Sequence, residues 1–271
     1  MIKSLRKAAV LGAGVMGSTI AAHLANAGIP VVLLDIVPPT LTDDEQGKGL
    51  TLADSVVRNR FAQGGKDRAL RAQPAAFFVP DRAHLVTVGN FEDSLGLLDD
   101  VDWIIEAVVE DLGSKQQLFE RVEAHRRDDA IVSTNTSGLP VHQIARGRST
   151  AFCQHFLGTH FFNPPRYLKL LEVTPLAQTA PEVIEAVSAW GDWRLGKGVV
   201  YPHDRPNFIA NRIGGYSGRK IVQLMLEHGL SIEDVDELTG PIIGHPRSAT
   251  FRTNDLVGLD TIIHVTENSY L

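Results

Sequence analysis

Two side chains with acid–base character lie in one apolar stretch of the chain. His160 and Glu172 belong to the run GTHFFNPPRYLKLLEVTP, in which two apolar segments are joined by the short link NPPRY. Because this link is too short for a crossover helix, the two segments are predicted to pair as antiparallel strands. A short turn between the strands can then bring both side chains onto one face of the sheet.

An imidazole held by a carboxylate can act as a general base. A hydride leaves a secondary alcohol carbon only when the hydroxyl proton is removed, and a neutral imidazole can accept that proton near pH 7. A carboxylate bonded to the far ring nitrogen fixes the tautomer and stabilises the imidazolium that forms. We therefore interpret His160 as a catalytic base and Glu172 as its partner, with a purely structural pair as the alternative.

A second group of residues, near the start of the chain, is typical of dinucleotide binding. The run GAGVMG comprises Gly12, Gly14 and Gly17, with Val15 and Met16 before the last of them. The first glycine permits a tight turn, the second lets the backbone approach a pyrophosphate, and the third lets a helix lie against the sheet. The N-terminus of that helix offers N–H donors and a partial positive charge to the phosphates. A glycine-rich turn in another kind of α/β protein is the alternative.

Asp35 completes this pattern at the end of the next predicted strand. It lies 18 positions after Gly17, close to the ~20 expected for an acid that binds the adenosine ribose hydroxyls. The same carboxylate would repel a 2′-phosphate, and Ile36 and Val37 provide no cation to neutralise one. The sequence therefore predicts NAD rather than NADP as the cofactor.

The elements that position these residues alternate between strands and helices. Apolar runs predict strands at residues 8–11, 30–34, 85–88, 102–109, 131–134, 156–162, 168–175 and 198–201. Helical spacing predicts helices after Gly17 and at 52–70, 115–124 and 181–195, with a surface excursion at 37–49. This alternation predicts an α/β fold, a doubly wound Rossmann-type parallel sheet with an antiparallel pair at its edge.

The last part of the chain reads differently, because only helical patterns remain past Arg205, at 207–227, at 231–238 and from about 254 onward. We therefore predict a NAD-binding domain at residues 1–205 and a small all-α domain at 206–271.

The small size of the helical domain predicts a neighbour. A domain of this size buries only about 60% of its unfolded surface. We expect either a second copy in a homodimer or a C-terminal continuation, since the chain stops at Leu271 inside a predicted helix. The contact is predicted to use an exposed apolar face that includes Leu256, Ile262, Ile263 and Val265.

Composition excludes several classes of function. The chain has 271 residues, of which 44% are hydrophobic and 21% charged, and a net charge of −6. This acidic balance argues against general nucleic-acid binding, which needs a basic face. No apolar run reaches the ~18 to 20 residues of a membrane span, and no metal site is predicted. The single cysteine, Cys153, rules out an internal disulfide, suits a reducing cytoplasm, and is expected to be a small buried residue.

Several motifs together resemble a known family. The L-3-hydroxyacyl-CoA dehydrogenases of fatty-acid β-oxidation carry motifs similar to GAGVMG, EAVVEDLGSKQQLF, NTSG, GTHFFNPPRYLKLLEVTP and PNFIANRI. The resemblance covers nearly the whole chain. It implies oxidation of a 3-hydroxyacyl-CoA to the 3-ketoacyl-CoA with NAD as the hydride acceptor, and it makes His160 the base and Glu172 its partner.

The resemblance also assigns roles outside this pair. Ser137 in NTSG and Asn211 in FIANR match the two polar groups that hold the substrate's reacting oxygen. A hydroxyl and an amide can both donate to an oxygen that gains carbonyl or alkoxide character. The alternatives are a loop cap for Ser137 and a helix-entry cap for Asn211. Glu110 and Lys115 match residues near the nicotinamide ribose.

A basic segment falls where the family places a helical hairpin along coenzyme A. It runs from Arg58 to Arg71 and includes Lys66. Cationic side chains such as Arg58 and Lys66 could bind the phosphates of an acyl-CoA substrate. An ordinary solvated helix face is the alternative.

The chain departs from the family pattern at several points. The excursion after Asp35 is longer than in compact members, Gly138 follows Ser137, and Asn207 stands where glycine is usual. The segment HPRSATFRTNDLVGLD lacks the usual Met-Gly-Pro step. These variants resemble the branch whose dehydrogenase is fused to an enoyl-CoA hydratase-type domain.

Two other functions stay open from the sequence. A dehydrogenase of the same architecture could act on a free hydroxy acid or a sugar acid, but only a CoA user needs the basic segment. A catalytically idle NAD-binding protein is the second alternative. A protein without activity does not need an acid–base pair and two groups that hold a reacting oxygen, so their presence argues against this alternative.

Overall fold

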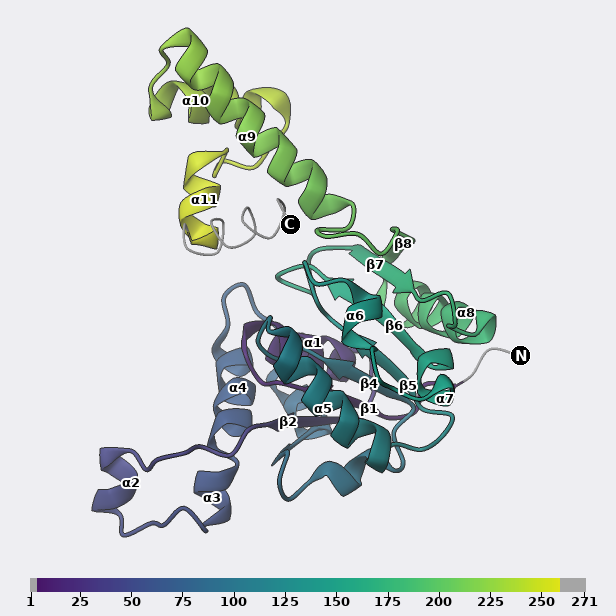
Figure 1. Cartoon of the computed structure of the whole chain (residues 1–271). Coiled ribbons are helices and arrows are strands. Elements are labelled where there is room, and N and C mark those ends of the chain that lie inside the picture. Colours follow the sequence, from purple (N-terminus) through teal and green to yellow (C-terminus); the bar gives the residue numbers. More distant parts are fainter. Residues whose placement is uncertain (1–3, 259–271) are drawn as a thin grey trace. The chain divides into compact units, whose positions relative to one another are not determined.

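The computed structural model describes residues 4–258 of the chain. The chain divides into two compact units between Asp204 and Arg205, and Figure 1 shows a sheet with helices in the first and helices alone in the second. This division lies one residue before the boundary predicted from the sequence. No helix in the described part of the chain has the length and apolar content of a membrane-spanning segment.

An eight-stranded sheet organises the first unit, with its strands in the order β3-β2-β1-β4-β5-β6-β7-β8. Their bounds are β1 Ala8–Leu11, β2 Val31–Asp35, β3 Val86–Asn90, β4 Trp103–Glu106, β5 Ile131–Thr134, β6 Phe156–Phe161, β7 Leu170–Pro175 and β8 Gly198–Val200. The first six strands pair in parallel, which confirms the predicted doubly wound sheet. The strand order reverses between β1 and β4, at the kind of switch point where open α/β sheets bind ligands.

The remaining two strands form the antiparallel edge that the sequence predicted. β7 pairs antiparallel with β6, as the short link between them predicted. β8 then pairs in parallel with the far side of β7. The helix after β7 returns the chain so that β8 becomes the outermost strand of this edge.

Helices lie between the strands and cover the sheet. Their bounds in the first unit are α1 Val15–Asn26, α2 Asp43–Gly47, α3 Ser55–Arg58, α4 Arg60–Arg71, α5 Leu112–His125, α6 Val141–Ile144, α7 Thr150–Gln154 and α8 Pro181–Ala189. Short 3-10 helices occur at Pro80–Leu85 and Leu95–Leu98, and a π-helical turn at Trp190–Arg194 follows α8. Cys153, expected to be buried, is only half-buried because α7 is a short surface helix.

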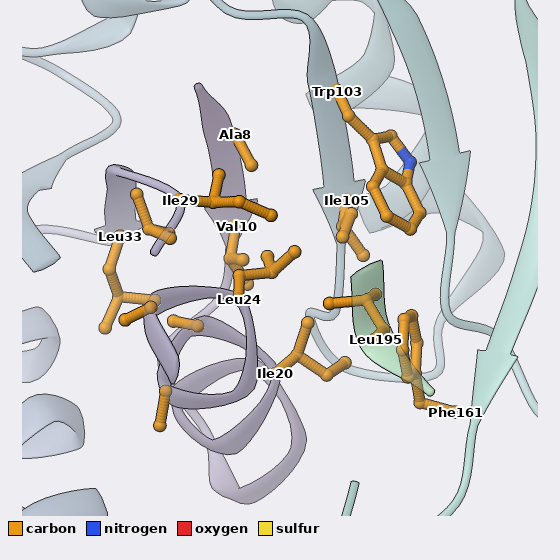
Figure 2. Packing of buried hydrophobic residues seen from close by; sticks show 14 of the residues in the cluster. Ala8, Val10, Ile20, Leu24, Ile29, Leu33, Trp103, Ile105, Phe161 and Leu195 are labelled. Atoms are coloured by element: carbon orange, nitrogen blue, oxygen red, sulfur yellow. The ribbon is translucent and has the colours of Figure 1, made fainter. Parts of the chain in front are cut away.

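Each face of the sheet has its own apolar packing. On one face, Ile20 and Leu24 point from α1 toward the strands that carry Val10 and Ile105 (Figure 2). On the other face, the Phe119 ring of α5 packs edge-on against Phe156 of β6, with ring centroids 5.1 Å apart. Strands buried on both faces explain why β1 and all but the last residue of β2 and β4 are continuous apolar runs.

The position of His160 follows from the alternation of side chains along β6. Phe156 faces α5, so His160, four residues later, lies on the same face, whereas Phe161 faces the opposite way. The Phe161 ring lies in the apolar cluster of that opposite face, 6.3 Å from the Trp103 ring centroid. The imidazole therefore projects from the face opposite α1.

The excursion between β2 and β3 contains more structure than the sequence predicted. Residues 43–47 form α2, which begins with a capping box between Thr42 and Glu45. The helix predicted at 52–70 is two helices, because the backbone leaves helical geometry at Asn59. The Asn59 side chain accepts a hydrogen bond of 2.7 Å from Asn90 at the end of β3, which anchors this break to the sheet.

The second unit is helical in its described part, as predicted, with α9 Ala210–His228, α10 Ile232–Leu238, a 3-10 turn at Pro241–Ile243 and α11 Phe251–Val257. α9 begins at 210 rather than 207, because Asn207 and Phe208 have φ angles of 64° and 42°. None of the residues of α9 is buried, and Leu226 is 72% exposed. Leu256 is 78% exposed, while Ile262, Ile263 and Val265 lie outside the described residues.

Candidate active site

The candidate site residues of the first unit lie at the carboxyl ends of the parallel strands. In the parallel ladder, Leu11 of β1 pairs with Glu106 of β4, Glu106 with Thr134 of β5, and Thr134 with Gly158 of β6. The glycine turn follows β1, the NTSG loop follows β5, and His160 comes two residues after Gly158. These groups therefore share the edge formed by the carboxyl ends of the parallel strands, where open α/β sheets bind ligands.

His160 and Glu172 face each other across the antiparallel pair of β6 and β7. The Nδ1 atom of His160 lies 2.7 Å from Oε2 of Glu172, and the two residues are 6% and 0% exposed. Because a carboxylate accepts hydrogen bonds, Nδ1 is assigned the proton, and Nε2 is the basic nitrogen of the neutral ring. The Phe162 ring packs beside the imidazole, with centroids 4.3 Å apart. In this arrangement the carboxylate fixes the tautomer and the orientation of the ring.

The three glycines of the turn after β1 serve different needs. A Cβ at Gly12, where φ is +102°, would lie 2.5 Å from the Ala107 carbonyl oxygen, and one at Gly17 would lie 1.8 Å from the Gly12 carbonyl oxygen. A Cβ at Gly14 would meet nothing within 4 Å. The fold itself thus requires the first and third glycines, whereas the second faces open space at the N-terminus of α1.

Asp35 is tied to this turn from the end of β2. Its Oδ2 accepts a hydrogen bond of 2.6 Å from the Ala13 N–H, and its Oδ1 accepts one of 2.7 Å from the Ile36 N–H. The carboxylate, the open space at Gly14 and the first N–H groups of α1, at Val15 and Met16, are therefore neighbours. These residues fit a dinucleotide, because they match its ribose, its close backbone approach and its phosphates.

Lys115 lies inside the protein rather than at an open surface. It is 1% exposed, and its Nζ contacts Glu106 Oε1 at 2.6 Å and Glu110 Oε2 at 3.2 Å. Glu106 is fully buried and also accepts a hydrogen bond of 2.5 Å from Thr134. Sequence reasoning missed Glu106, although an acid that ends an apolar strand must find a cation or donors when it is buried.

Glu110 shapes the NTSG loop that carries Ser137. Its Oε1 accepts hydrogen bonds from the Thr136 hydroxyl at 2.5 Å and from the Ser137 and Gly138 N–H groups at 3.0 and 3.1 Å. Burial alone would raise the pKa of Glu110, but the charge of Lys115 and these hydrogen bonds hold the pKa of its carboxyl below the ordinary value. Glu110 is therefore an anionic anchor for this loop.

Ser137 itself is held by its backbone rather than by its side chain. Within the described residues its Oγ makes no hydrogen bond, so the alternative role as a loop cap has no support in the structure. The hydroxyl is thus available to a ligand at the shared edge. A neighbour that the sequence did not single out, Asn135, accepts a hydrogen bond of 2.9 Å from the Phe161 N–H and ties this loop to β6 beside His160.

The cations of the basic segment are bonded within the first unit. Arg58 donates two hydrogen bonds to Asp93, at 2.6 and 2.7 Å, and Lys66 donates one of 2.8 Å to the Val86 carbonyl. Arg68 reaches the glycine turn, where it donates 2.7 Å to the Ala13 carbonyl. The segment is thus part of the packed unit and joins α4 to the cofactor turn.

Asn211 belongs to the second unit, in the first turn of α9. Ile209 occupies the N-cap position of that helix, and no side chain there forms a cap hydrogen bond. The alternative role of Asn211 as a helix-entry cap is therefore not supported.

Comparison with known proteins gives the family. Residues 7–205 match the NAD binding domain of 3-hydroxyacyl-CoA dehydrogenase, and residues 208–271 match its C-terminal domain. The chain belongs to the 3-hydroxyacyl-CoA dehydrogenase family. The resemblance drawn from the motifs is confirmed, and the NAD-binding assignment of the first unit with it.

Relatives within the 3-hydroxyacyl-CoA dehydrogenase family differ in length. The chain is 54% identical over 270 residues to a probable 3-hydroxyacyl-CoA dehydrogenase of Bacillus subtilis, of which it spans 34%. It is 52% identical to one of Deinococcus radiodurans, of which it spans 71%. The crystal structure of a (S)-3-hydroxybutyryl-CoA dehydrogenase from Ralstonia eutropha is 27% identical with a TM-score of 0.75, covering 98% of this chain and 87% of that one.

Proposed function

We propose that this chain catalyses the NAD-dependent oxidation of an L-3-hydroxyacyl-CoA to the 3-ketoacyl-CoA, the dehydrogenation step of fatty-acid β-oxidation. The observation that carries this proposal is the buried hydrogen bond of 2.7 Å between His160 Nδ1 and Glu172 Oε2. It supports a base whose ring is oriented by a carboxylate, at the carboxyl ends of the strands where the dinucleotide turn also lies. An orienting carboxylate and a base are the expected parts of an acid–base catalyst.

In this mechanism His160 Nε2 accepts the proton of the substrate hydroxyl. Bound NAD supplies the acceptor for the hydride that leaves the same carbon. Glu172, which holds Nδ1–H, stabilises the imidazolium that forms. The Ser137 hydroxyl donates to the reacting oxygen as it becomes a carbonyl, and Asn211 is proposed to donate to the same oxygen. In the reverse direction the imidazolium returns the proton to that oxygen.

The choice of NAD over NADP is proposed from Asp35. Its carboxylate stands at the end of β2 next to the glycine turn, where an acid binds the ribose hydroxyls and repels a 2′-phosphate. Glu110 and Lys115 are proposed to support the nicotinamide ribose, acting from the buried cluster that also holds the NTSG loop.

The acyl-CoA substrate is proposed from the family and from the basic segment. Arg58 and Lys66 use some of their donors within the unit. A guanidinium carries five N–H donors and an ammonium three, so each retains donors for CoA phosphates. A soluble, cytoplasmic setting and a homodimer or a contact with a further segment are proposed with this function.

The experiment that tests the proposal compares substrates. NADH formation is measured with 3-hydroxybutyryl-CoA, with longer 3-hydroxyacyl-CoAs and with free 3-hydroxybutyrate. The proposed function predicts turnover of the thioesters and little or none of the free acid. Turnover of the free acid at an equal rate would favour the alternative hydroxy-acid dehydrogenase, and NAD binding without any turnover would favour an idle NAD-binding protein.

A further inference from the structure

A buried lysine supports the turn that joins the two strands of the acid–base pair. Lys197 lies between the π-helical turn after α8 and strand β8, and it is 3% exposed. Its Nζ donates hydrogen bonds to the carbonyl oxygens of Pro165 and, at 2.8 Å, of Leu168. The same ammonium lies 5.7 Å from the centroid of the Phe161 ring. Lys197 thus contacts both β6 and residues 162–169, the β6–β7 turn.

The environment of this ammonium is costly for a charge. Within the described residues no carboxylate forms an ion pair with Lys197, and burial lowers its pKa to about 8. A methionine would fill similar space without desolvating a cation. The compensating interactions of the ammonium are its bonds to carbonyl groups of a single turn.

The β6–β7 turn is held mainly by bonds to other parts of the unit, among them those that Arg166 and Tyr167 donate to the Ala75 carbonyl. Within it the Tyr167 and Leu168 N–H groups both donate to the Pro164 carbonyl, at 3.0 Å each. Pro164 and Pro165 have no N–H of their own, so the turn has few internal hydrogen bonds. Lys197 supplies donors to two of the turn's carbonyls and fixes the turn against the body of the unit.

The segment that carries Lys197 is itself fixed to the cofactor helix. His23 of α1 lies with its Nε2 3.1 Å from the Leu195 carbonyl oxygen, two residues before Lys197. α1 is the helix that begins at the glycine turn. A continuous path of contacts therefore runs from α1 through Leu195 and Lys197 to the turn, whose first residue, Phe162, packs against the His160 ring.

We propose that Lys197 is a positioning residue for the dehydrogenase reaction. Its ammonium holds the β6–β7 turn, and thereby Phe162 and the His160 ring, in fixed register with the helix that presents the cofactor. This inference rests on the proposed function, because it assigns Lys197 an effect that acts through His160. Lys197 does not touch the reacting atoms in this account.

The test compares Lys197→Met with two matched variants in the full chain. Lys197→Arg keeps a cation that can donate to two carbonyls. Lys169→Met makes the same substitution at an exposed lysine of the same turn. We expect kcat of Lys197→Met to fall about 10- to 100-fold, because small misplacements of a reacting group have effects of this size. The KM and Kd for NAD stay within about twofold of wild type, Lys197→Arg recovers most of kcat, and Lys169→Met resembles wild type.

A second measurement does not depend on activity. Hydrogen exchange of the Tyr167 and Leu168 amides is expected to speed up in Lys197→Met, while exchange in α1 stays at its wild-type rate. Wild-type kcat in a folded Lys197→Met variant would overturn the inference. So would a parallel loss of kcat and NAD affinity with faster exchange throughout the unit, which is the signature of a merely structural residue. A wild-type chain without any turnover would instead contradict the proposed function.

Discussion

At the scale of single residues, one hydrogen bond decides which nitrogen of His160 can take a proton. Glu172 accepts from Nδ1, so Nε2 is the basic atom. The sequence predicted this pair because a link of five residues between two apolar runs leaves antiparallel pairing as the simple solution. It did not predict Glu106, whose cation Lys115 lies on the following helix. It also did not predict Asn135, which accepts a hydrogen bond from the backbone N–H of Phe161, 26 positions later.

Glu172→Gln tests the orienting role. A neutral amide can no longer stabilise the imidazolium, and it can donate to Nδ1 and so move the ring proton to Nε2. We expect kcat to fall by about 10² to 10⁴, as for other bases that lose an orienting carboxylate. Steady-state rates across pH measure this, with Glu182→Gln at an exposed position of α8 as the control. An unchanged pH–rate profile in Glu172→Gln would contradict the pairing.

At the scale of elements, the strand–helix alternation was enough to predict the sheet, but not the local breaks. The split of the basic helix at Asn59 depends on a bond to Asn90, which no local pattern reveals. The position of β8 as the outermost strand depends on which side of β7 the chain pairs with after α8, and no local pattern reveals that side. The glycine turn is the opposite case, because its spacing, together with the strand before it, the helix after it and Asp35, predicts both the bend and the ligand.

Gly14→Ala separates the glycine that serves a ligand from those that serve the fold. A Cβ at Gly14 meets nothing within 4 Å, so we expect the free energy of unfolding to change by less than about 1 kcal/mol. The Kd for NAD should rise about tenfold or more, because the methyl group occupies the space for the pyrophosphate. Calorimetric NAD titration and urea unfolding measure the two effects. Gly17→Ala, whose Cβ would lie 1.8 Å from the Gly12 carbonyl oxygen, should destabilise the fold; equal stability of both variants would contradict this assignment.

At the scale of the whole molecule, the chain combines a well-packed α/β unit with a helical unit whose described residues include many exposed apolar side chains. α9 has no buried residue, and Leu226 and Leu256 are 72% and 78% exposed. The sequence predicted both units and the character of the second. Which neighbour covers this surface stays a prediction, because a helical pattern alone does not identify a partner.

Stability against acid tests the buried contact between α1 and the segment of Lys197. Burial, with the charges of Lys197 and Arg166, lowers the pKa of His23 to about 4. The unfolded chain protonates this residue below about pH 6.5, so the stability present above that pH is lost as pH falls toward 4. The loss from this group is on the order of 3 kcal/mol.

His23→Gln should flatten this part of the pH dependence, since an amide can still donate to the Leu195 carbonyl but does not titrate. Urea unfolding at neutral and at mildly acidic pH measures the difference. His84→Gln, at an exposed position, should lose stability with acid as the wild type does. An equal acid loss in His23→Gln and in the wild type would refute the role of His23.

The role of His160 as the base is tested most directly by the turnover of His160→Gln with 3-hydroxybutyryl-CoA and NAD, measured beside its affinity for NAD. Removal of the base predicts a fall in kcat of about 10² to 10⁴, while the Kd for NAD stays at the wild-type value because the glycine turn and Asp35 are untouched. A His160→Gln variant that forms NADH at the wild-type rate would show that His160 is not the base.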